Sequence, residues 1–225
     1  MRCVCCNGPG EYHEPLPGLP PLIGEKKYKC KRCTHTWFDI DQPAVDKYHI
    51  DNAKWGYKNL VTRDGYHNKR ISVIRKYMKW PPKSVLDVGC GDGRFLELAK
   101  SKDSTGVDVS TEIDGSNINL VSGSFGDVKI SRTFSLVTSF HSMEHVVDIV
   151  GFFKKILRLS SGIVAIEIPT RRPMRRFVAG HVHGFNGASF SRFIERHLKG
   201  TKFETIKFAG KVQGSSVLWI GGRRG

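Results

Sequence analysis

The chain has 225 residues, of which 39% are hydrophobic and 25% charged, and its formal net charge is +15. These values are typical of a globular protein long enough for one α/β domain with a small appendage, and they exclude wholesale disorder. No apolar run approaches the ~18 residues needed to span a bilayer, and no apolar segment follows the first residues. A soluble protein of the reducing cytoplasm is therefore expected.

The charge is distributed unevenly along the chain. Residues 1–83 carry a net charge of +8, residues 84–170 carry −3 and residues 171–225 carry +10. Individual basic residues commonly form no more than a solvated surface. Two basic flanks around a slightly acidic middle nevertheless favour a polyanionic partner.

Five of the six cysteines lie within the first 33 residues. Cys3 and Cys6 form one C-x-x-C knuckle, and Cys30 and Cys33 form a second. Two such knuckles can surround one tetrahedral Zn²⁺, whose binding would supply the folding energy that this Pro- and Gly-rich segment lacks. We expect a zinc ribbon over residues 1–38, with a structural metal because four protein ligands leave no open position.

The sequence leaves open which N-terminal residues bind the expected zinc ion. Cys5 could replace Cys3 or Cys6, and His13 and His35 are weaker substitutes. A disulfide is the competing interpretation, but nothing in the sequence indicates an oxidising compartment. Cys90 stands apart, inside a glycine-rich turn, and is expected to be a small buried packing residue.

The rest of the chain predicts alternating strands and helices. Residues 39–83 should form a basic connector, extended over 39–52 and helical over 66–79, where apolar residues recur at helical spacing. Residues 84–225 should form a Rossmann-like, doubly wound α/β domain whose seven-stranded sheet is mostly parallel. Its strands are expected at 84–88, 105–109, 119–122, 134–139, 162–169, 203–209 and 215–220, the last two as a hairpin, and its helices at 94–100, 146–159 and 189–198.

A glycine-rich turn follows the first strand of this domain, in residues 85–93. In a doubly wound sheet, ligands bind beyond the carboxyl ends of the strands, near the first one. Asp108 lies at the end of the next strand, where a carboxylate can accept both ribose hydroxyls. The turn reads G-x-G-x-G rather than the G-x-G-x-x-G of dinucleotide dehydrogenases, and Asp87 before it suits an ammonium group better than a pyrophosphate.

Four segments together carry a resemblance: residues 85–93, Gly106-Val-Asp-Val109, His141-Ser-Met-Glu-His145 and residues 163–169. Over residues 84–220 they are similar to the successive motifs of class I S-adenosylmethionine-dependent methyltransferases. The expected ribbon and the late His181-Val-His-Gly-Phe185 resemble bacterial methyltransferases with an N-terminal zinc ribbon, many of which act on sugars or other small molecules.

The resemblance implies a cofactor site for S-adenosylmethionine. Asp87, Gly89 and Gly91 would hold its methionine end and Asp108 its ribose. The remaining residues implied to contact the cofactor are Cys90, Val109, Ser124, Phe125, Phe140 and His141. The sequence departs from the family pattern where Ser124 replaces an acidic residue and where Ser135 follows Phe134 in place of an aspartate, so the adenine contacts are the least well defined.

The candidates for the acceptor pocket are more ambiguous. Glu144, His145, His181, His183 and Phe185 could line it or could fill the core. Aromatic residues ahead of the domain could stack on a base or pack internally; they are Trp55, Tyr57 and Tyr66.

The catalytic motifs that the sequence lacks help to predict which atom accepts the methyl group. Guanine N-7 carries a free lone pair and needs no general base, whereas ribose methylation needs a Lys-Asp-Lys-Glu tetrad that the sequence does not place. The charge therefore favours in-line methylation of an RNA cap guanine at N-7, by an enzyme that resembles small viral capping enzymes and would act in the host cytoplasm. The expected RNA contacts are Lys69, Arg70, Arg75, Lys76, Arg171, Arg172, Arg175 and Arg176.

Two alternatives stay open. The acceptor could be a nucleotide-linked sugar or another small metabolite, as the motifs favour. The chain could also be a non-catalytic zinc-containing RNA-binding protein, but such a protein would not need the Asp87 turn and Asp108.

Overall fold

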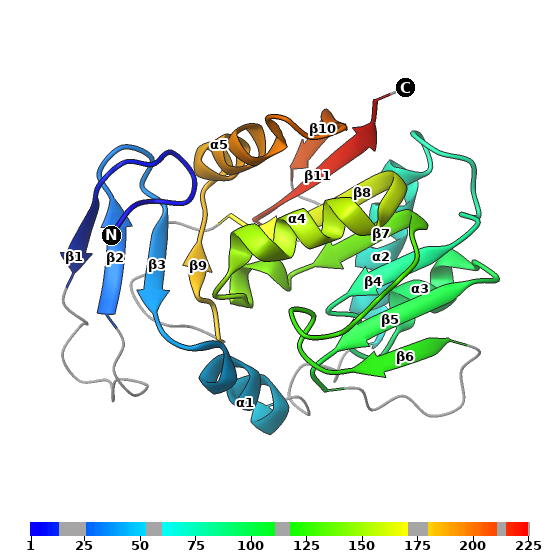
Figure 1. Cartoon of the computed structure of the whole chain (residues 1–225). Helices are drawn as coiled ribbons and strands as arrows, with labels where there is room; N and C mark the ends of the chain where they lie inside the picture. Colours follow the sequence, from blue (N-terminus) through cyan, green and yellow to red (C-terminus); the bar gives the residue numbers. More distant parts are fainter. Residues whose placement is uncertain (14–25, 53–59, 111–117, 171–179, 211–214, 225) are drawn as a thin grey trace.

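A computed structural model describes residues 1–13, 26–52, 60–110, 118–170, 180–210 and 215–224. It contains two β-sheets, one of seven strands and one of four (Figure 1). Within these ranges, none of the helices is long and apolar enough to cross a membrane.

The larger sheet has the strand order β10-β11-β8-β7-β4-β5-β6. Five strands run parallel, namely β4 (Val85–Val88), β5 (Ser104–Asp108), β6 (Asn119–Ser122), β7 (Phe134–Phe140) and β8 (Ser160–Pro169). The last two strands, β10 (Phe203–Gly210) and β11 (Ser216–Arg223), form an antiparallel hairpin that pairs with β8. The predicted doubly wound sheet is confirmed, and its central strands β4, β7 and β8 are mostly apolar and buried, as strands covered on both faces must be.

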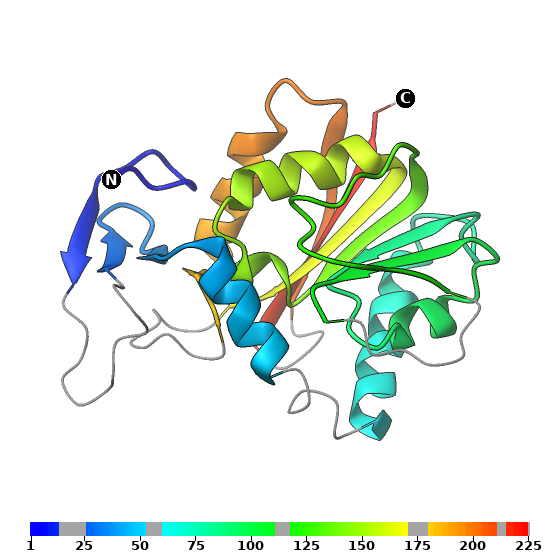
Figure 2. The same cartoon turned by 60° about the horizontal axis from the view of Figure 1, so that its bottom comes forward.

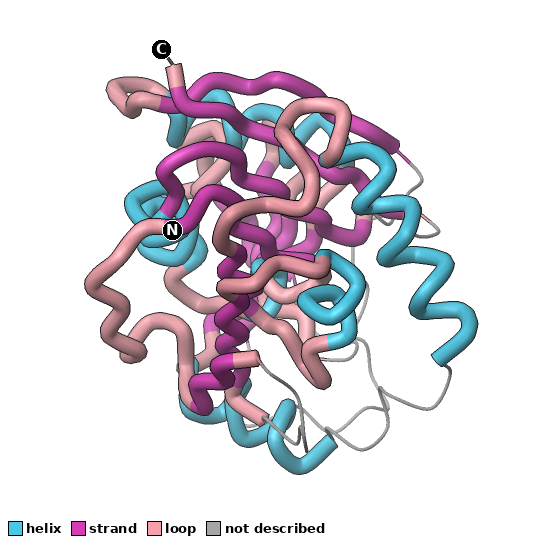
Figure 3. The backbone as a smooth tube through the Cα atoms, turned by 90° about the vertical axis from the view of Figure 1, so that its right-hand side faces the viewer, coloured by secondary structure: helices cyan, strands magenta, loops and turns pink. Residues whose placement is uncertain are grey.

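Helices cover both faces of this sheet, as the side view shows (Figure 3). α4 (Ile149–Leu159) and α5 (Gly187–Leu198) lie on one face, and α2 (Leu60–Ile74) and α3 (Arg94–Ala99) on the other (Figures 1 and 2). Successive strand residues point to opposite faces, so Leu86 joins the core beneath α4 while Val85 joins the core beneath α3.

Hydrogen bonds from capping side chains explain where α4 and α5 begin. The Asp148 carboxylate accepts a hydrogen bond from the Gly151 backbone at 2.9 Å and so starts α4. Asn186 and Ser189 form a reciprocal capping box at the start of α5.

The smaller sheet, called here the cysteine sheet, joins two distant parts of the chain. Its order is β1 (Gly10–His13), β2 (Lys26–Cys30), β3 (Thr36–Asp39) and β9 (His183–Gly184), and all of its pairings are antiparallel. β9 comes from the segment that follows β8, so the N-terminal cysteine region is hydrogen-bonded directly to the larger domain.

Two predictions about residues 39–83 need correction. Residues 39–52 are not extended: they contain the helix α1 (Gln42–Asn52). It starts where the Asp41 carboxylate accepts a hydrogen bond from the Ala44 backbone at 2.9 Å, and it buries only a narrow face around Val45. That narrow face is why it has no clear apolar periodicity. The second helix, α2, starts earlier and ends earlier than predicted, at Leu60 and Ile74.

Candidate functional site

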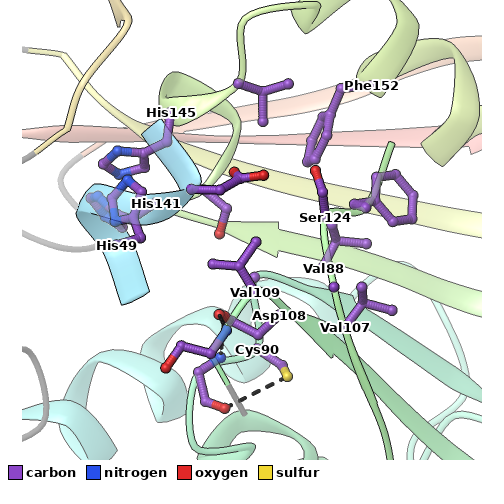
Figure 4. Close-up of a pocket in the computed structure, with 18 of the residues that line it drawn as sticks. His49, Val88, Cys90, Val107, Asp108, Val109, Ser124, His141, His145 and Phe152 are labelled. Atoms are coloured by element: carbon purple, nitrogen blue, oxygen red, sulfur yellow. Dashed lines mark hydrogen bonds between the residues drawn. The ribbon is translucent and has the colours of Figure 1, made fainter. Parts of the chain in front are cut away.

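A cavity of about 360 Å³ lies at the carboxyl ends of β4, β5, β6 and β7, where the expected cofactor site should be (Figure 4). The turns that follow these strands form one wall of it. The helix α1 contributes to the opposite wall, together with residues around the short turn Met143–His145. The cavity is lined by Gln42, Asp46, His49, His67, Val88, Gly89, Cys90, Gly91, Asp92, Val107, Asp108, Val109, Ser110, Gly123, Ser124, Phe125, His141, Ser142, His145, Val146 and Phe152.

The glycine turn brings backbone, rather than side chains, to the cavity. Gly89 has φ of +76°, and a Cβ atom there would lie 1.8 Å from the Ser142 hydroxyl oxygen. A side chain at position 89 would therefore be strained and would also clash. The glycine thus lets the turn pack closely against Ser142, which also lines the cavity.

Asp108 fixes the geometry of the wall. One carboxylate oxygen accepts a hydrogen bond from the Gly91 backbone at 2.8 Å, and the other accepts one from the Ser110 backbone at 3.0 Å. The carboxylate thereby links the turn after β4 to the turn after β5. Its remaining lone pairs are available to hydroxyl groups in the cavity that it lines.

Asp87 lies beneath this wall rather than in it. Its side chain is only 3% exposed, it is not among the lining residues, and it accepts a hydrogen bond from the Thr138 hydroxyl at 2.7 Å. Burial raises the pKa of Asp87 to about 6, although the Thr138 hydrogen bond and the Arg70 charge oppose the shift. The structure therefore holds this carboxylate against Thr138 of β7, outside the lining of the cavity.

Most of the other expected cofactor residues do reach the cavity. Gly89, Cys90, Gly91, Val109, Ser124, Phe125 and His141 all line it. Phe140 does not: its ring packs 4.8 Å from that of Phe95 and carries the Arg70 guanidinium at 4.5 Å. Phe140 is thus a core residue beside the site, which corrects its expected role.

The opposite wall is rich in histidine. Figure 4 shows His49, His141 and His145 gathered on one side of the cavity, and the rings of His49 and His145 are 4.4 Å apart. Burial, reinforced by His49 and His181, holds the pKa of His145 well below its ordinary value. The imidazole of His145 is therefore neutral at physiological pH.

Behind these rings lies Glu144, which is 0% exposed. Its Oε1 atom is 3.7 Å from His141 Nδ1, 3.8 Å from His145 Nε2 and 4.0 Å from His181 Nε2. Burial raises the pKa of Glu144 to about 7, against the opposing effect of His141. The structure thus brings together three of the expected acceptor-side residues, Glu144, His145 and His181.

The other two expected acceptor-side residues lie elsewhere. His183 Nδ1 is 3.2 Å from His35 Nε2, and the two rings stack with centroids 5.3 Å apart. Phe185 packs against the same His35 ring at 4.7 Å. Both are buried between the cysteine sheet and the larger domain, because β9 pairs with β3 there, so neither lines the cavity.

Sequence reasoning missed the contribution of α1. Gln42, Asp46 and His49 line the cavity from one face of this helix. Their spacing of four and three residues is a helical signal, but all three are polar or titratable. A search for apolar periodicity could not find them.

One of the expected RNA contacts is wrong. Arg70 is only 4% exposed, and its Nε donates to Glu167 Oε2 at 2.5 Å, with both side chains inside the protein. Lys69, Arg75 and Lys76 are exposed on or just after α2. The remaining expected contacts, Arg171, Arg172, Arg175 and Arg176, lie outside the described residues, as do Trp55 and Tyr57; Tyr66 is half-buried.

Four of the five N-terminal cysteines converge. The sulfur atoms of Cys3, Cys6, Cys30 and Cys33 all lie within 4.8 Å of one another, with Cys3–Cys33 at 3.5 Å and Cys6–Cys30 at 3.4 Å. A tetrahedral zinc ion with Zn–S bonds of about 2.3 Å separates its sulfur ligands by roughly 3.8 Å, so this set fits such an ion. Cys5 is buried beside the four and belongs instead to a second, three-residue grouping with Cys3 and His35.

The fold and this cavity define the class of protein: a class I S-adenosylmethionine-dependent methyltransferase. Residues 63–207 match the family model described as "Methyltransferase domain", and the chain belongs to that family. A search of curated proteins finds no matching sequence.

Solved structures share the fold. The chain is similar to the Burkholderia thailandensis 1,6-didemethyltoxoflavin-N1-methyltransferase, with 12% identity and a TM-score of 0.65 over 96% of this chain and 100% of that one. It is also similar to the plantazolicin methyltransferase, with 11% identity and a TM-score of 0.62 over 82% and 98%. The magnesium protoporphyrin IX methyltransferase of Synechocystis PCC 6803 has 13% identity and a TM-score of 0.58 over 81% and 100%.

Proposed function

We propose that this methyltransferase acts on a small molecule that binds against the histidine-rich wall of the cavity. The observation that carries the proposal is the wall itself. It places His49 and His145 across the cavity from the glycine turn and Asp108. The acceptor and the methyl donor would then share one partly enclosed space, in which alignment of the acceptor with the sulfonium methyl group supplies much of the rate enhancement.

The roles of the cofactor-side residues follow from their positions. The glycine turn would receive the methionine end of the cofactor against its backbone, and Asp108 would accept hydrogen bonds from the ribose hydroxyls. Asp87 would act indirectly, by holding the turn in place from beneath. Ser124 and Phe125, at the far end of the cavity, would border the adenine.

Names of similar structures support a small acceptor. Those proteins are named for toxoflavin, plantazolicin and magnesium protoporphyrin IX, or are bound to analogues of such compounds. At 11–13% identity they share a fold with this chain, and their variety shows that the same fold accommodates chemically diverse small acceptors.

Methylation of an RNA cap guanine at N-7 is the second candidate, and the charge favours it. The chain carries +15, and Lys69, Arg75 and Lys76 are exposed on the α2 side. The buried Arg70 removes one contact from that basic surface. N-7 methylation also needs no ionisable group at the acceptor, so it leaves the buried Glu144 and its histidines without a task.

We further propose that the four converging cysteines hold a structural Zn²⁺. All four positions of a tetrahedral ion would be filled by thiolates, so the ion would stabilise the fold rather than activate a substrate. Its binding would fix β2 and β3, and through the pairing of β3 with β9 would fix the segment that precedes α5.

The test is transfer of a labelled methyl group from S-adenosylmethionine to three acceptor pools. These are RNA capped with unmethylated guanine, uncapped RNA, and a metabolite fraction below about 1 kDa. We expect label in the metabolite fraction, lost in Asp108→Ala. Transfer only to capped RNA, abolished when its guanine is already N-7 methylated, would replace the first candidate with the second.

A further inference from the structure

Glu144, His145 and His181 form a compact group at the back of the acceptor wall. One ligand atom from each lies within 4.8 Å of the other two. Glu144 and His145 come from the turn after β7, whereas His181 comes from the segment before β9, so the fold brings them together from parts of the chain 36 residues apart.

The carboxylate of Glu144 is buried without a hydrogen-bond partner among the described residues. The side chain is 0% exposed, and both of its oxygens lack a partner in that part of the chain. The nearest imidazole nitrogens, at 3.7 to 4.0 Å, are too distant for hydrogen bonds. A buried, unpaired carboxylate is costly, and native proteins commonly compensate it with a charge partner or a metal ion.

The separations suit a cation. Metal bonds to imidazole nitrogen and carboxylate oxygen are about 2.0–2.2 Å long, so ligand atoms on one ion lie roughly 3–3.5 Å apart. The separations from Glu144 Oε1 to His145 Nε2 and His181 Nε2, 3.8 and 4.0 Å, exceed this by less than about 1 Å. A small rotation of the side chains would close the site around an ion.

We propose that Glu144, His145 and His181 bind a divalent transition-metal cation beside the acceptor pocket. One carboxylate and two imidazoles suit the borderline cations Zn²⁺, Co²⁺ and Fe²⁺, and the carboxylate also suits the harder Mn²⁺. Three protein ligands leave coordination positions open, and one of the three, His145, borders the cavity.

This site narrows the substrate class, and that part of the inference rests on the proposed function. A cation here would bind a hydroxyl oxygen of the acceptor and lower its pKa, so that the proton leaves to water. The oxygen lone pair then forms a bond to the methyl carbon as the carbon–sulfur bond breaks. The electrons of the carbon–sulfur bond return to sulfur, which gives S-adenosylhomocysteine and a methyl ether. The acceptor is accordingly a hydroxylated small molecule.

The experiment uses the full chain with its thiolate cluster loaded with Zn²⁺, titrated with Mn²⁺ while free Mn²⁺ is followed by electron paramagnetic resonance. Mn²⁺ prefers oxygen and nitrogen ligands, so it does not compete for the four cysteines. We expect one Mn²⁺ per chain. Glu144→Gln and His181→Gln should each weaken binding at least tenfold, whereas His49→Gln, a histidine of the same wall outside the group, should not.

Binding of S-adenosylhomocysteine is measured by calorimetry on every variant. This measurement distinguishes loss of the metal site from loss of the folded, cofactor-binding protein. Because His181 is partly exposed, its variant serves if Glu144→Gln fails to fold. Absence of Mn²⁺ binding by wild-type protein that still binds S-adenosylhomocysteine overturns the metal site and leaves the proposed function standing. Equal Mn²⁺ affinity in all variants also overturns it, and so does undiminished transfer to a hydroxylated acceptor after chelation.

Discussion

Replacing Arg70 with methionine tests whether this residue belongs to the interior or to an RNA-binding surface. Methionine retains much of the length of the side chain and its contact with Phe140 but removes the charge. In the wild type, the guanidinium contacts Glu167 at 2.5 Å, and both side chains are at most 5% exposed. Glu167 also accepts a hydrogen bond from the Ser216 hydroxyl. The substitution leaves a carboxylate buried without its cationic partner.

The size of the effect follows from the burial of the pair. Removing one partner of a buried ion pair costs about 3–5 kcal/mol, because the other charge is left uncompensated. The pKa of Glu167 shows that Arg70 shares this stabilisation with two other groups. Burial alone would raise this pKa, but His141, Arg70 and Ser216 stabilise the carboxylate and lower the pKa from 4.5 to about 2. A shift of that size corresponds to roughly 3 kcal/mol in favour of the ionised form.

The pH dependence has a definite sign. A lowered folded-state pKa stabilises the protein above pH 4.5 and loses that effect as the pH falls toward about 2. Without Arg70, one of the groups that lower the pKa of Glu167 is lost while His141 and Ser216 remain, so the pKa rises toward its ordinary value. The variant's deficit should therefore be greatest near pH 7 and should shrink on acidification, as Glu167 takes up a proton.

Urea denaturation followed by circular dichroism at pH 7 and pH 4 measures both effects. Lys69→Met, an exposed neighbour on α2, is the matched control and should change the free energy of unfolding by less than about 0.5 kcal/mol. Adding Glu167→Gln to the Arg70 variant should recover much of the loss. A loss below about 1 kcal/mol for Arg70→Met, as for an exposed pair, would refute the reasoning and return Arg70 to the surface.

Three further predictions concern the cofactor site and the cysteines. Gly89→Ala should lower the free energy of unfolding by about 1–2 kcal/mol in urea denaturation, because a side chain at φ +76° is strained and meets Ser142; an unchanged free energy of unfolding would mean that the turn and Ser142 adjust without cost. Asp87→Asn should raise the free energy of unfolding of the apo protein at pH 8 by up to about 3 kcal/mol. The pKa of Asp87 is raised from 3.8 to about 6, so its stabilising effect is complete below 3.8 and lost as the pH rises through 6; a difference that does not vary between pH 8 and pH 4 would contradict this. Cys6→Ser should lower the Co²⁺–thiolate absorption and the melting temperature, whereas Cys5→Ser should preserve the absorption; the opposite result would exchange their roles.

The sheet and the cofactor wall were predictable because their physical signals are local. Strands buried on both faces are mostly apolar, and residues 85–88 and 163–168 are apolar apart from Asp87 and Glu167. Gly89 and Gly91 have positive φ angles, which other residues rarely adopt. The two glycines therefore mark the turn in the sequence. Asp108 could be located because it ends the neighbouring strand.

The acceptor wall was only partly predictable because its contacts are not local. Arg70 lies on a polar, basic stretch of the sequence, which predicts an exposed side chain. It points inward because it contacts Glu167, which is 97 residues away in the sequence. His183 occurs in the same short motif as His181, yet the two separate. Pairing of β9 with β3 places His183 against His35, while His181 remains near Glu144.

The cysteine sheet and the acceptor wall are structurally coupled, and this explains the asymmetry between the two halves of the site. β3 ends at Asp39 and α1 begins at Gln42, whose side-chain oxygen accepts a hydrogen bond from the Val147 backbone at 2.8 Å. His49, which lines the cavity, follows β3, and His181, which lies near Glu144, precedes β9, whereas His141 and His145 follow β7 of the larger sheet. The glycine turn and Asp108 depend instead on β4 and β5 of the larger sheet. The glycine-turn wall is therefore built within the larger sheet, whereas the histidine-rich wall also includes α1, which directly follows the cysteine sheet.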